Sequence, residues 1–379
     1  MKKIALIGTD WNVNEDRKKN NKYGGVTYYR LVKPLLELDT DEYEFVYHGA
    51  DLMQEAESKG IVEFWDDFVS RYDAFIVKAI DNEEACSNLL FFVRKYGKKI
   101  ILDLDDNLFE VKPDQPAYKY YAPGKPKRAV VATLISFVDA LFVSTQPLAD
   151  YYKNIVKEMF GTDLKVFVLP NYNDASDFSF EQAKKDPEKT VIGWVGSTTH
   201  FNDLKIVLKA MNRLLKEFPN LYFELVGGIT HEDAPKLFSD VDDFVLDRVF
   251  CGSGTESWDG YPKFLSTLAW DIGIAPLTND EFNRGKSHIK WLEYSMYKIP
   301  TVASRVYPYH MPVLGTETIV DGKTGYLCDE KEWYSKLKKL VLNKELREEI
   351  GNNAYEYVKN NLQYDPHRHL WLEALSQIV

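Results

Sequence analysis

Short apolar runs alternate with longer amphipathic stretches along the chain, and this alternation constrains the fold most strongly. A continuous apolar run is typical of a parallel strand that is buried on both faces. Strands that alternate with helices predict a doubly wound parallel α/β sheet. In the first half the predicted strands are 3–8, 43–47, 74–78, 99–104, 140–144 and a final strand that begins at Lys165 and is ended by Pro170. A helix is predicted over 23–38, helical or amphipathic stretches over 51–71, 82–96 and 126–137, and a further helix with Pro147 near its start.

The same alternation resumes after a polar interruption. Residues 174–189 are rich in polar and charged side chains, and a new buried strand begins at Thr190. A chain of 379 residues exceeds the size at which one core keeps growing. We therefore expect two Rossmann-like domains, at residues 1–173 and 190–362, with the boundary in the polar stretch.

Composition argues against several classes of partner and environment. The formal charge is 47 − 58 = −11, which disfavours non-specific binding to nucleic acid. The three cysteines, at 86, 251 and 328, have neither paired spacing nor an even count, so we expect no disulfide framework and a reducing, cytoplasmic setting. No segment approaches the roughly 20 apolar residues that span a bilayer, so we expect peripheral membrane contact at most.

The stretch from Trp270 to Ser304 holds the densest group of candidate binding residues. It is predicted to form a strand, a loop, a helix opening near Asn283 and a second strand. A helix N-terminus carries a partial positive charge. The candidate cations here, Arg284, Lys286 and Lys290, would add to that field and favour an anion such as a diphosphate, with Ser287 between them.

Glu293 follows on the same predicted helix. Lys286, Lys290 and Glu293 are expected on one face, next to a buried stripe at 289, 292, 296 and 299. The carboxylate of Glu293 could accept hydrogen bonds from sugar hydroxyls. The alternative is that Lys290 and Glu293 form a solvated pair on the helix surface, worth tenths of a kcal/mol.

Acidic residues end the fourth predicted strand. Asp103, Asp105 and Asp106 could bind a divalent metal, serve as a general base with a raised pKa, or cap the next turn. Ligands of doubly wound sheets bind beyond the carboxyl ends of strands, which favours a functional role.

Two glycine turns are further candidates for a close approach to a ligand. Gly24 and Gly25 follow the first strand, where they are either ordinary turn residues or ligand contacts. The backbone N–H groups of Gly196 and Ser197 could hold a phosphate. His200 lies nearby and is either a substitute cation or, more often for such a residue, a structural histidine.

Several of these segments resemble the GT4-like, group 1 glycosyltransferases of GT-B fold. Residues 298–304, Lys-Ile-Pro-Thr-Val-Ala-Ser, are similar to the G-x-P-V-V-A strand of that family, and residues 319–327 resemble its E-N-G-x-T-G-x-L hairpin. The chain departs from the pattern with Ser197 and Asn202 where the family carries Arg and Lys. Glu293 matches the second glutamate of E-x7-E, whereas Gly285 replaces the first.

The resemblance implies an enzyme that moves a sugar from a nucleoside-diphosphate donor to a saccharide or other hydroxyl acceptor. It implies two domains facing across a cleft, with the donor in the second and residues 363–379 packing back on the first. Gly25 would then lie near the transferred sugar, Glu293 would hold the ribose, and Asp105 and Asp106 would serve the acceptor.

The same resemblance implies catalysis without a metal or other cofactor, by Lys286 and Lys290, and retention of anomeric configuration. The loss of the first glutamate puts retention in question. Two alternatives stay open: an epimerase or hydrolase of the same fold, and a sugar-binding or scaffold protein without turnover.

Overall fold

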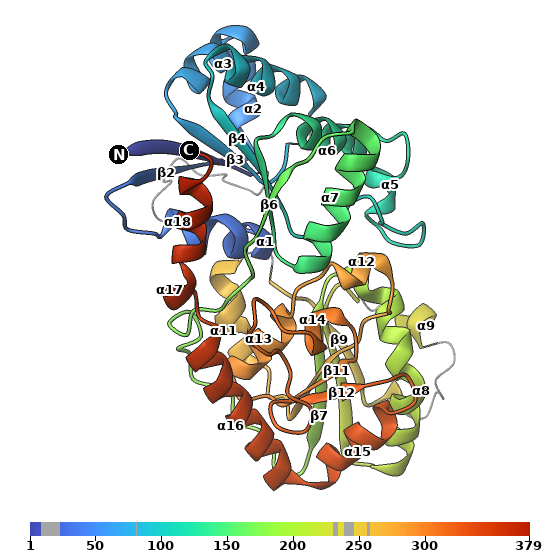
Figure 1. Cartoon of the computed structure of the whole chain (residues 1–379). Coiled ribbons are helices and arrows are strands. Elements are labelled where there is room, and N and C mark those ends of the chain that lie inside the picture. The colour runs from blue at the N-terminus through green and yellow to red at the C-terminus, as the bar shows by residue number, and fades with distance from the viewer. Residues whose placement is uncertain (9–22, 81, 230–233, 239–245, 256–257) are drawn as a thin grey trace. The chain divides into compact units, whose positions relative to one another are not determined.

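The computed structural model describes residues 1–8, 23–80, 82–229, 234–238, 246–255 and 258–379. The chain divides into two compact units (Figure 1). The first comprises Met1–Asn171, Ser257–Asp259 and Tyr364–Val379, and the second comprises Tyr172–Glu256 and Gly260–Gln363. Each unit is built on a six-stranded parallel sheet, so the α/β prediction is confirmed.

The sheet of the first unit has the order β2-β1-β3-β4-β5-β6. Its strands are β1 Lys2–Ile7, β2 Tyr43–His48, β3 Ala74–Val77, β4 Lys99–Leu104, β5 Ala140–Val143 and β6 Lys165–Val168. The helices are α1 Gly25–Thr27, the π-helix η1 Tyr28–Leu36, α2 Asp51–Lys59, α3 Ile61–Ser70, α4 Glu83–Lys95, α5 Tyr118–Tyr121, α6 Pro126–Phe137, α7 Gln146–Phe160, α17 Tyr364–His367 and α18 His369–Ser376.

Two helices of this unit differ from the prediction. The single helix expected over 51–71 is broken at Gly60, whose φ of 87° lies where a helix cannot continue. The helix expected over 23–38 is a short α-helical turn followed by the π-helix η1, which includes Pro34. Proline lacks the N–H that an α-helix interior needs, which disfavours a regular α-helix there.

The sheet of the second unit has the order β12-β11-β10-β7-β8-β9. Its strands are β7 Thr190–Gly196, β8 Leu221–Gly227, β9 Val249–Gly252, β10 Ile272–Ala275, β11 Thr301–Ser304 and β12 Tyr326–Cys328. The helices include the 3-10 turn η2 Thr198–His200, α8 Phe201–Glu217, α9 Ala234–Leu237, α11 Tyr261–Thr267, α12 Glu281–Arg284, α13 Ile289–Met296, α14 Tyr307–His310, α15 Trp333–Leu342 and α16 Lys344–Asn361; the 3-10 turn η3 Trp258–Gly260 begins in the first unit.

Three predictions for the second unit were wrong in detail. The segment expected as a loop from Cys251 begins inside β9. The segment likened to a hairpin leads instead into β12, which pairs in parallel with β11. The helix expected from Asn283 onward is two helices, because the chain leaves helical geometry between Gly285 and His288.

Each sheet has its own hydrophobic core. In the first unit the core includes Phe64, Trp65 and Phe68 of α3 against the strands, and in the second it includes Trp194 of β7 and Trp333 of α15. All three cysteines are free and buried. No helix within the described ranges is long and apolar enough to cross a membrane.

Both chain termini lie in the first unit. Figure 1 shows the N- and C-terminal ends close together, and Lys2 Nζ donates to the carbonyl of Val379 over 2.5 Å. Tyr364 of α17 donates from its hydroxyl to the carbonyl of Tyr29, so the C-terminal segment is tied to η1.

Candidate functional site

Lys290, His200 and Asp203 form a chain of polar contacts in the second unit. Lys290 Nζ lies 3.3 Å from His200 Nε2, and His200 Nδ1 lies 2.8 Å from Asp203 Oδ2. His200 is the last residue of η2 and the N-cap of α8, and Asp203 is in the first turn of α8; both are buried, whereas Lys290 is the second residue of α13. Packing of α8 and α13 against one sheet therefore unites residues ninety positions apart.

The carboxylate of Asp203 is held on both oxygens. Its Oδ1 accepts from Thr278 N at 2.8 Å, Thr278 Oγ1 at 3.0 Å and Asn283 Nδ2 at 2.8 Å, while Oδ2 faces His200. These donors belong to the segment that follows β10. The carboxylate thus links α8 to the loop that leads into α12 and cannot rotate without breaking several hydrogen bonds.

The imidazole of His200 is neutral. Burial lowers its pKa to about 4, and the positive charge of Lys290 acts in the same direction. The hydrogen bond to Asp203 opposes this shift without overcoming it. A neutral ring that donates from Nδ1 to Asp203 presents the lone pair of Nε2 to Lys290.

The predicted phosphate turn follows β7 next to this cluster. Ser197 is exposed, and its Oγ lies 2.7 Å from Thr199 Oγ1. A side chain at Gly196 would lie 2.5 Å from the ring of Trp194, and one at Gly228 would lie within 2.1 Å of the Ser197–Thr198 backbone. Close packing therefore fixes the turn, and the rings of Trp194 and His200 lie in a T-shaped arrangement with their centres 6.1 Å apart.

Glu293 is buried inside the unit and faces a tyrosine. Its Oε2 accepts from Tyr261 Oη at 2.8 Å. All residues of α13 from Trp291 to Met296 are buried, so the prediction of a polar helix face through Glu293 was wrong. Other elements enclose the helix on every side, which a pattern read along one helix cannot show.

The remaining basic residues are arranged differently from the prediction. Lys286 and Ser287 lie between α12 and α13 and not on a helix, and the Lys286 ammonium sits 4.5 Å from the ring centre of Phe282. Lys286 still contributes to the low pKa of His200, which places it within electrostatic reach. Arg284 is half exposed, donates to Asn279 and pairs with Glu281 at 3.7 Å.

In the first unit Asp103 is committed to an internal ion pair. Its two carboxylate oxygens accept from Arg30 Nε at 2.9 Å and Nη2 at 2.7 Å, with both residues fully buried. Arg30 also donates to the carbonyl of Leu169 and, at 3.1 Å, to Asn171. Asp103 therefore anchors η1 to the end of the sheet, which disfavours the alternative of a metal ligand at this position.

Asp105 and Asp106 follow on the loop after β4. Burial raises the pKa of Asp105 to about 6, and the neighbouring charge of Asp106 adds to the rise, while Lys78 and Arg30 oppose it. The loop is held by Tyr152, which donates to the carbonyl of Asp106 at 3.0 Å and accepts from Leu108 N at 3.1 Å. A carboxylate with a pKa near 6 on a fixed loop is suited to proton transfer at neutral pH.

Gly25 is the first residue of α1, directly after the N-cap Gly24. Its backbone is not left-handed, and an added side chain would make only an ordinary contact, at 3.8 Å, with Trp258. Trp258 stacks on Tyr28 with ring centres 4.4 Å apart. The sequence gives no sign that a residue so late in the chain joins the first unit.

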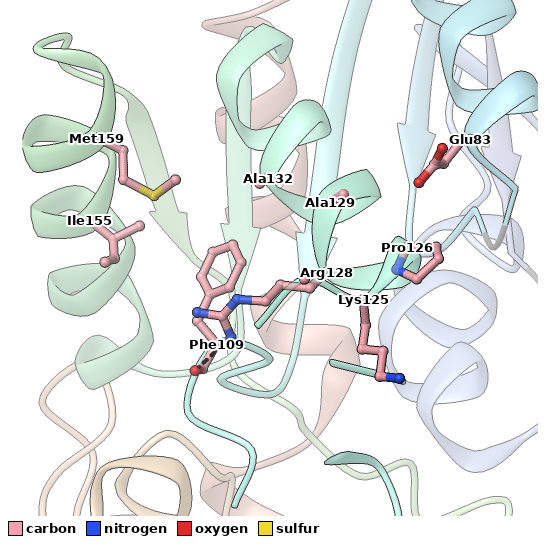
Figure 2. A pocket seen from close by; sticks show the side chains of 10 residues that line it. Glu83, Phe109, Lys125, Pro126, Arg128, Ala129, Ala132, Ile155 and Met159 are labelled. Atoms are coloured by element: carbon pink, nitrogen blue, oxygen red, sulfur yellow. Dashed lines mark hydrogen bonds between the residues drawn. The ribbon is translucent and has the colours of Figure 1, made fainter. Parts of the chain in front are cut away.

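A pocket of about 310 Å³ opens in the first unit beside the Asp105 loop (Figure 2). Ile155 and Met159 of α7 line one side, Phe109 and Arg128 lie in the middle, and Lys125 is on the far side. Arg128 donates to the carbonyl of Phe109 at 2.9 Å and stacks over its ring. None of the predicted site residues lines this pocket.

Comparisons with known proteins agree on the class of fold. HepE of Anabaena, solved in complex with UDP, has a TM-score of 0.62 at 14% identity and covers 99% of this chain and 100% of its own. The E. coli structure described as trehalose-6-phosphate bound with UDP-2-fluoro glucose has a TM-score of 0.62 at 10% identity, with 99% of each chain covered. With its two parallel-sheet units, the chain has the GT-B fold of glycosyltransferases.

The sequence comparisons find similarity over about half of the chain. Residues 175–357 match the family described as glycosyl transferases group 1. Trehalose synthase of Thermococcus litoralis is 24% identical over 214 residues, which are 52% of this chain and 47% of that protein. The chain therefore spans about half the length of this curated relative.

Proposed function

We propose that the protein transfers a sugar from a nucleoside-diphosphate sugar to a hydroxyl group of a saccharide or other acceptor. The observation that carries the proposal is the Lys290–His200–Asp203 cluster beside the turn at Gly196, inside the residues that match the group 1 family. A fixed ammonium near the exposed hydroxyl of Ser197 suits a diphosphate. Arg284 is a weaker candidate for binding the diphosphate, because its guanidinium already donates to Asn279.

The transfer breaks the bond between the sugar C1 and the diphosphate oxygen and forms a bond from C1 to the acceptor oxygen. Negative charge builds on the departing diphosphate, and Lys290 and Lys286 stabilise that charge electrostatically. The acceptor hydroxyl loses its proton as the new bond forms. Asp105, with a pKa near 6, is our candidate for the group that receives this proton, and Asp106 holds the acceptor beside it.

The proposal includes three finer points that rest on the resemblance and on chemistry. The cationic side chains supply the positive charge, so the reaction needs no divalent metal. Glu293 holds the ribose, with Tyr261 fixing its carboxylate. Anomeric configuration is retained, as the match of Glu293 to the family motif suggests. Because HepE was solved with UDP, UDP-sugars are the first donors to test.

A transfer assay tests the proposal. Purified protein is screened by thermal shift against UDP, GDP, ADP, CMP, dTDP and their sugar conjugates in EDTA, because a ligand of the native state raises the midpoint. The stabilising donor is then supplied in labelled form with a set of saccharide acceptors, and the anomeric proton of the product is read by NMR. Release of free sugar without acceptor would indicate a hydrolase instead.

Two lysine variants link the activity to the site. Lys290→Met and Lys286→Met should each lower kcat at least tenfold, which corresponds to more than about 1.4 kcal/mol of transition-state stabilisation. Lys209→Met is the matched control, because Lys209 is exposed on α8. Full activity in either site variant, with the protein folded, would refute the role given to these cations.

A further inference from the structure

We infer that His200 and Asp203 are positioning residues that fix the ammonium of Lys290 at the donor diphosphate, acting as one unit with it. This inference rests on the proposed function and extends it to two buried residues. Neither residue needs to touch the donor. Their effect passes through the 2.8 Å contact between Asp203 and His200 and the 3.3 Å contact between His200 and Lys290.

The order of the three groups determines what each can do. Asp203 is acceptor-only when ionised, so the ring nitrogen facing it carries the proton. In a neutral imidazole the other nitrogen is then an acceptor, and it faces an ammonium that has three donors and no acceptor. Asp203 thereby selects the tautomer of His200, and that tautomer orients one N–H of Lys290.

Asp203 is itself immobilised before any ligand binds. Three donors from Thr278 and Asn283 converge on Oδ1 and leave Oδ2 directed at the histidine. A lysine side chain has about 2 kcal/mol of rotamer entropy, and an anchored contact reduces what a ligand must order. The cluster thus orders the Lys290 side chain before the ligand binds, so that binding loses less side-chain entropy.

A neutral His200 is necessary for this arrangement. The charged and titratable groups that act on it are Asp203 from the adjoining helix α8, Lys290 from α13 and Lys286 from the loop before α13. Protonation of Nε2 would remove the acceptor and place a third cation beside the two lysines. Burial disfavours the protonated imidazole. A histidine that only filled space would not need Lys290 as a partner of its Nε2.

A double-mutant cycle on the full chain tests the coupling. His200→Ala should lower kcat/KM for the donor about tenfold when Lys290 is present and less than twofold in the Lys290→Met background, because the pair acts through the lysine. His200→Gln, which keeps an acceptor, should recover part of the loss. If instead the double variant loses kcat/KM by the product of the two single-variant factors, and the unfolding midpoints of the variants match, the two residues act independently and the inference is overturned.

Nitrogen-15 NMR of histidine-labelled protein tests the same arrangement without reference to activity. The His200 signal, assigned by its loss in His200→Gln, should show the Nδ1-protonated tautomer at neutral pH. Lys290→Met should raise the pKa of His200, because the repulsion from the ammonium is removed. An Nε2-protonated ring, or a pKa that Lys290→Met leaves unchanged, would overturn the inference even if transfer activity is found.

The two arms separate the inference from the proposed function. If the chain has transfer activity but the two single-variant factors simply multiply in the double variant, the positioning role is refuted and the proposed glycosyltransferase activity stands. If the unmodified chain neither binds nor turns over any nucleotide sugar, the proposed function fails and the inferred role fails with it, while the NMR result still decides the contact geometry.

Discussion

Replacing Asp105 by Asn should stabilise the first unit while it removes the candidate base. Burial and Asp106 raise the Asp105 pKa from 3.8 to about 6. The folded state therefore binds this proton more tightly than the unfolded state, and stability is lost as pH rises from about 4 through 6. A shift of about two units corresponds to roughly 3 kcal/mol at most. Asparagine does not ionise and avoids that cost.

The assay is denaturant unfolding of both proteins between pH 4 and pH 8. At pH 7.5 the Asp105→Asn variant should be more stable by about 2–3 kcal/mol, and the gain should shrink as pH falls through 6 and vanish near pH 4. Asp41→Asn, at an exposed position in the same unit, should show no such gain. Because two units can unfold separately, the change should appear in one transition. A gain independent of pH, or a loss of stability at pH 7.5, would refute the reasoning.

Two further predictions concern the framework of each unit. Arg30→Met leaves the buried Asp103 carboxylate without its partner and should lower the free energy of unfolding in urea by about 3–5 kcal/mol. The double variant Arg30→Met/Asp103→Leu, which removes both charges, should recover most of that stability. An Arg30→Met variant as stable as the unmodified protein would contradict the buried pair. Gly193→Ala places a methyl group 1.9 Å from the ring of Trp270 and should lower the free energy of unfolding by at least about 1–3 kcal/mol. Gly252→Ala, whose new methyl group would have its nearest neighbour at 4.0 Å, should lower it by less than about 0.5 kcal/mol. Equal losses in the two variants would contradict the packing described.

The sequence was sufficient for the sheets because parallel strands buried on both faces produce continuous apolar runs. The run at Lys99–Leu104 marks β4 with the bounds that the structure has, and the run that begins at Thr190 marks the start of β7, whereas Gly196, predicted in the following turn, is the last residue of that strand. Helices were less predictable where a neighbour decides their geometry. The break between Arg284 and Ile289 has no proline, and α13 has no polar face because the rest of the unit encloses it.

The candidate site was predictable only in part, because its cluster forms in three dimensions. Lys290 was identified from the local density of positive charge. His200 was weighed mainly as a structural residue, and Asp203 was missed, although a histidine and an aspartate three positions apart at a helix start share a face. Lys290, the partner of His200, lies ninety residues away, beyond the reach of any local pattern. Trp258 was missed for the same reason.

Nucleotide binding in the absence of divalent metal tests the central claim most directly. Isothermal titration of the full chain with UDP in EDTA, followed by the same titration of Lys290→Met and Lys209→Met, measures whether the second unit has a diphosphate site built on lysine. We predict one UDP per chain, at least tenfold weaker binding to Lys290→Met and unchanged binding to Lys209→Met. No binding of UDP or the other nucleotides, or binding that needs a divalent ion, would contradict the account.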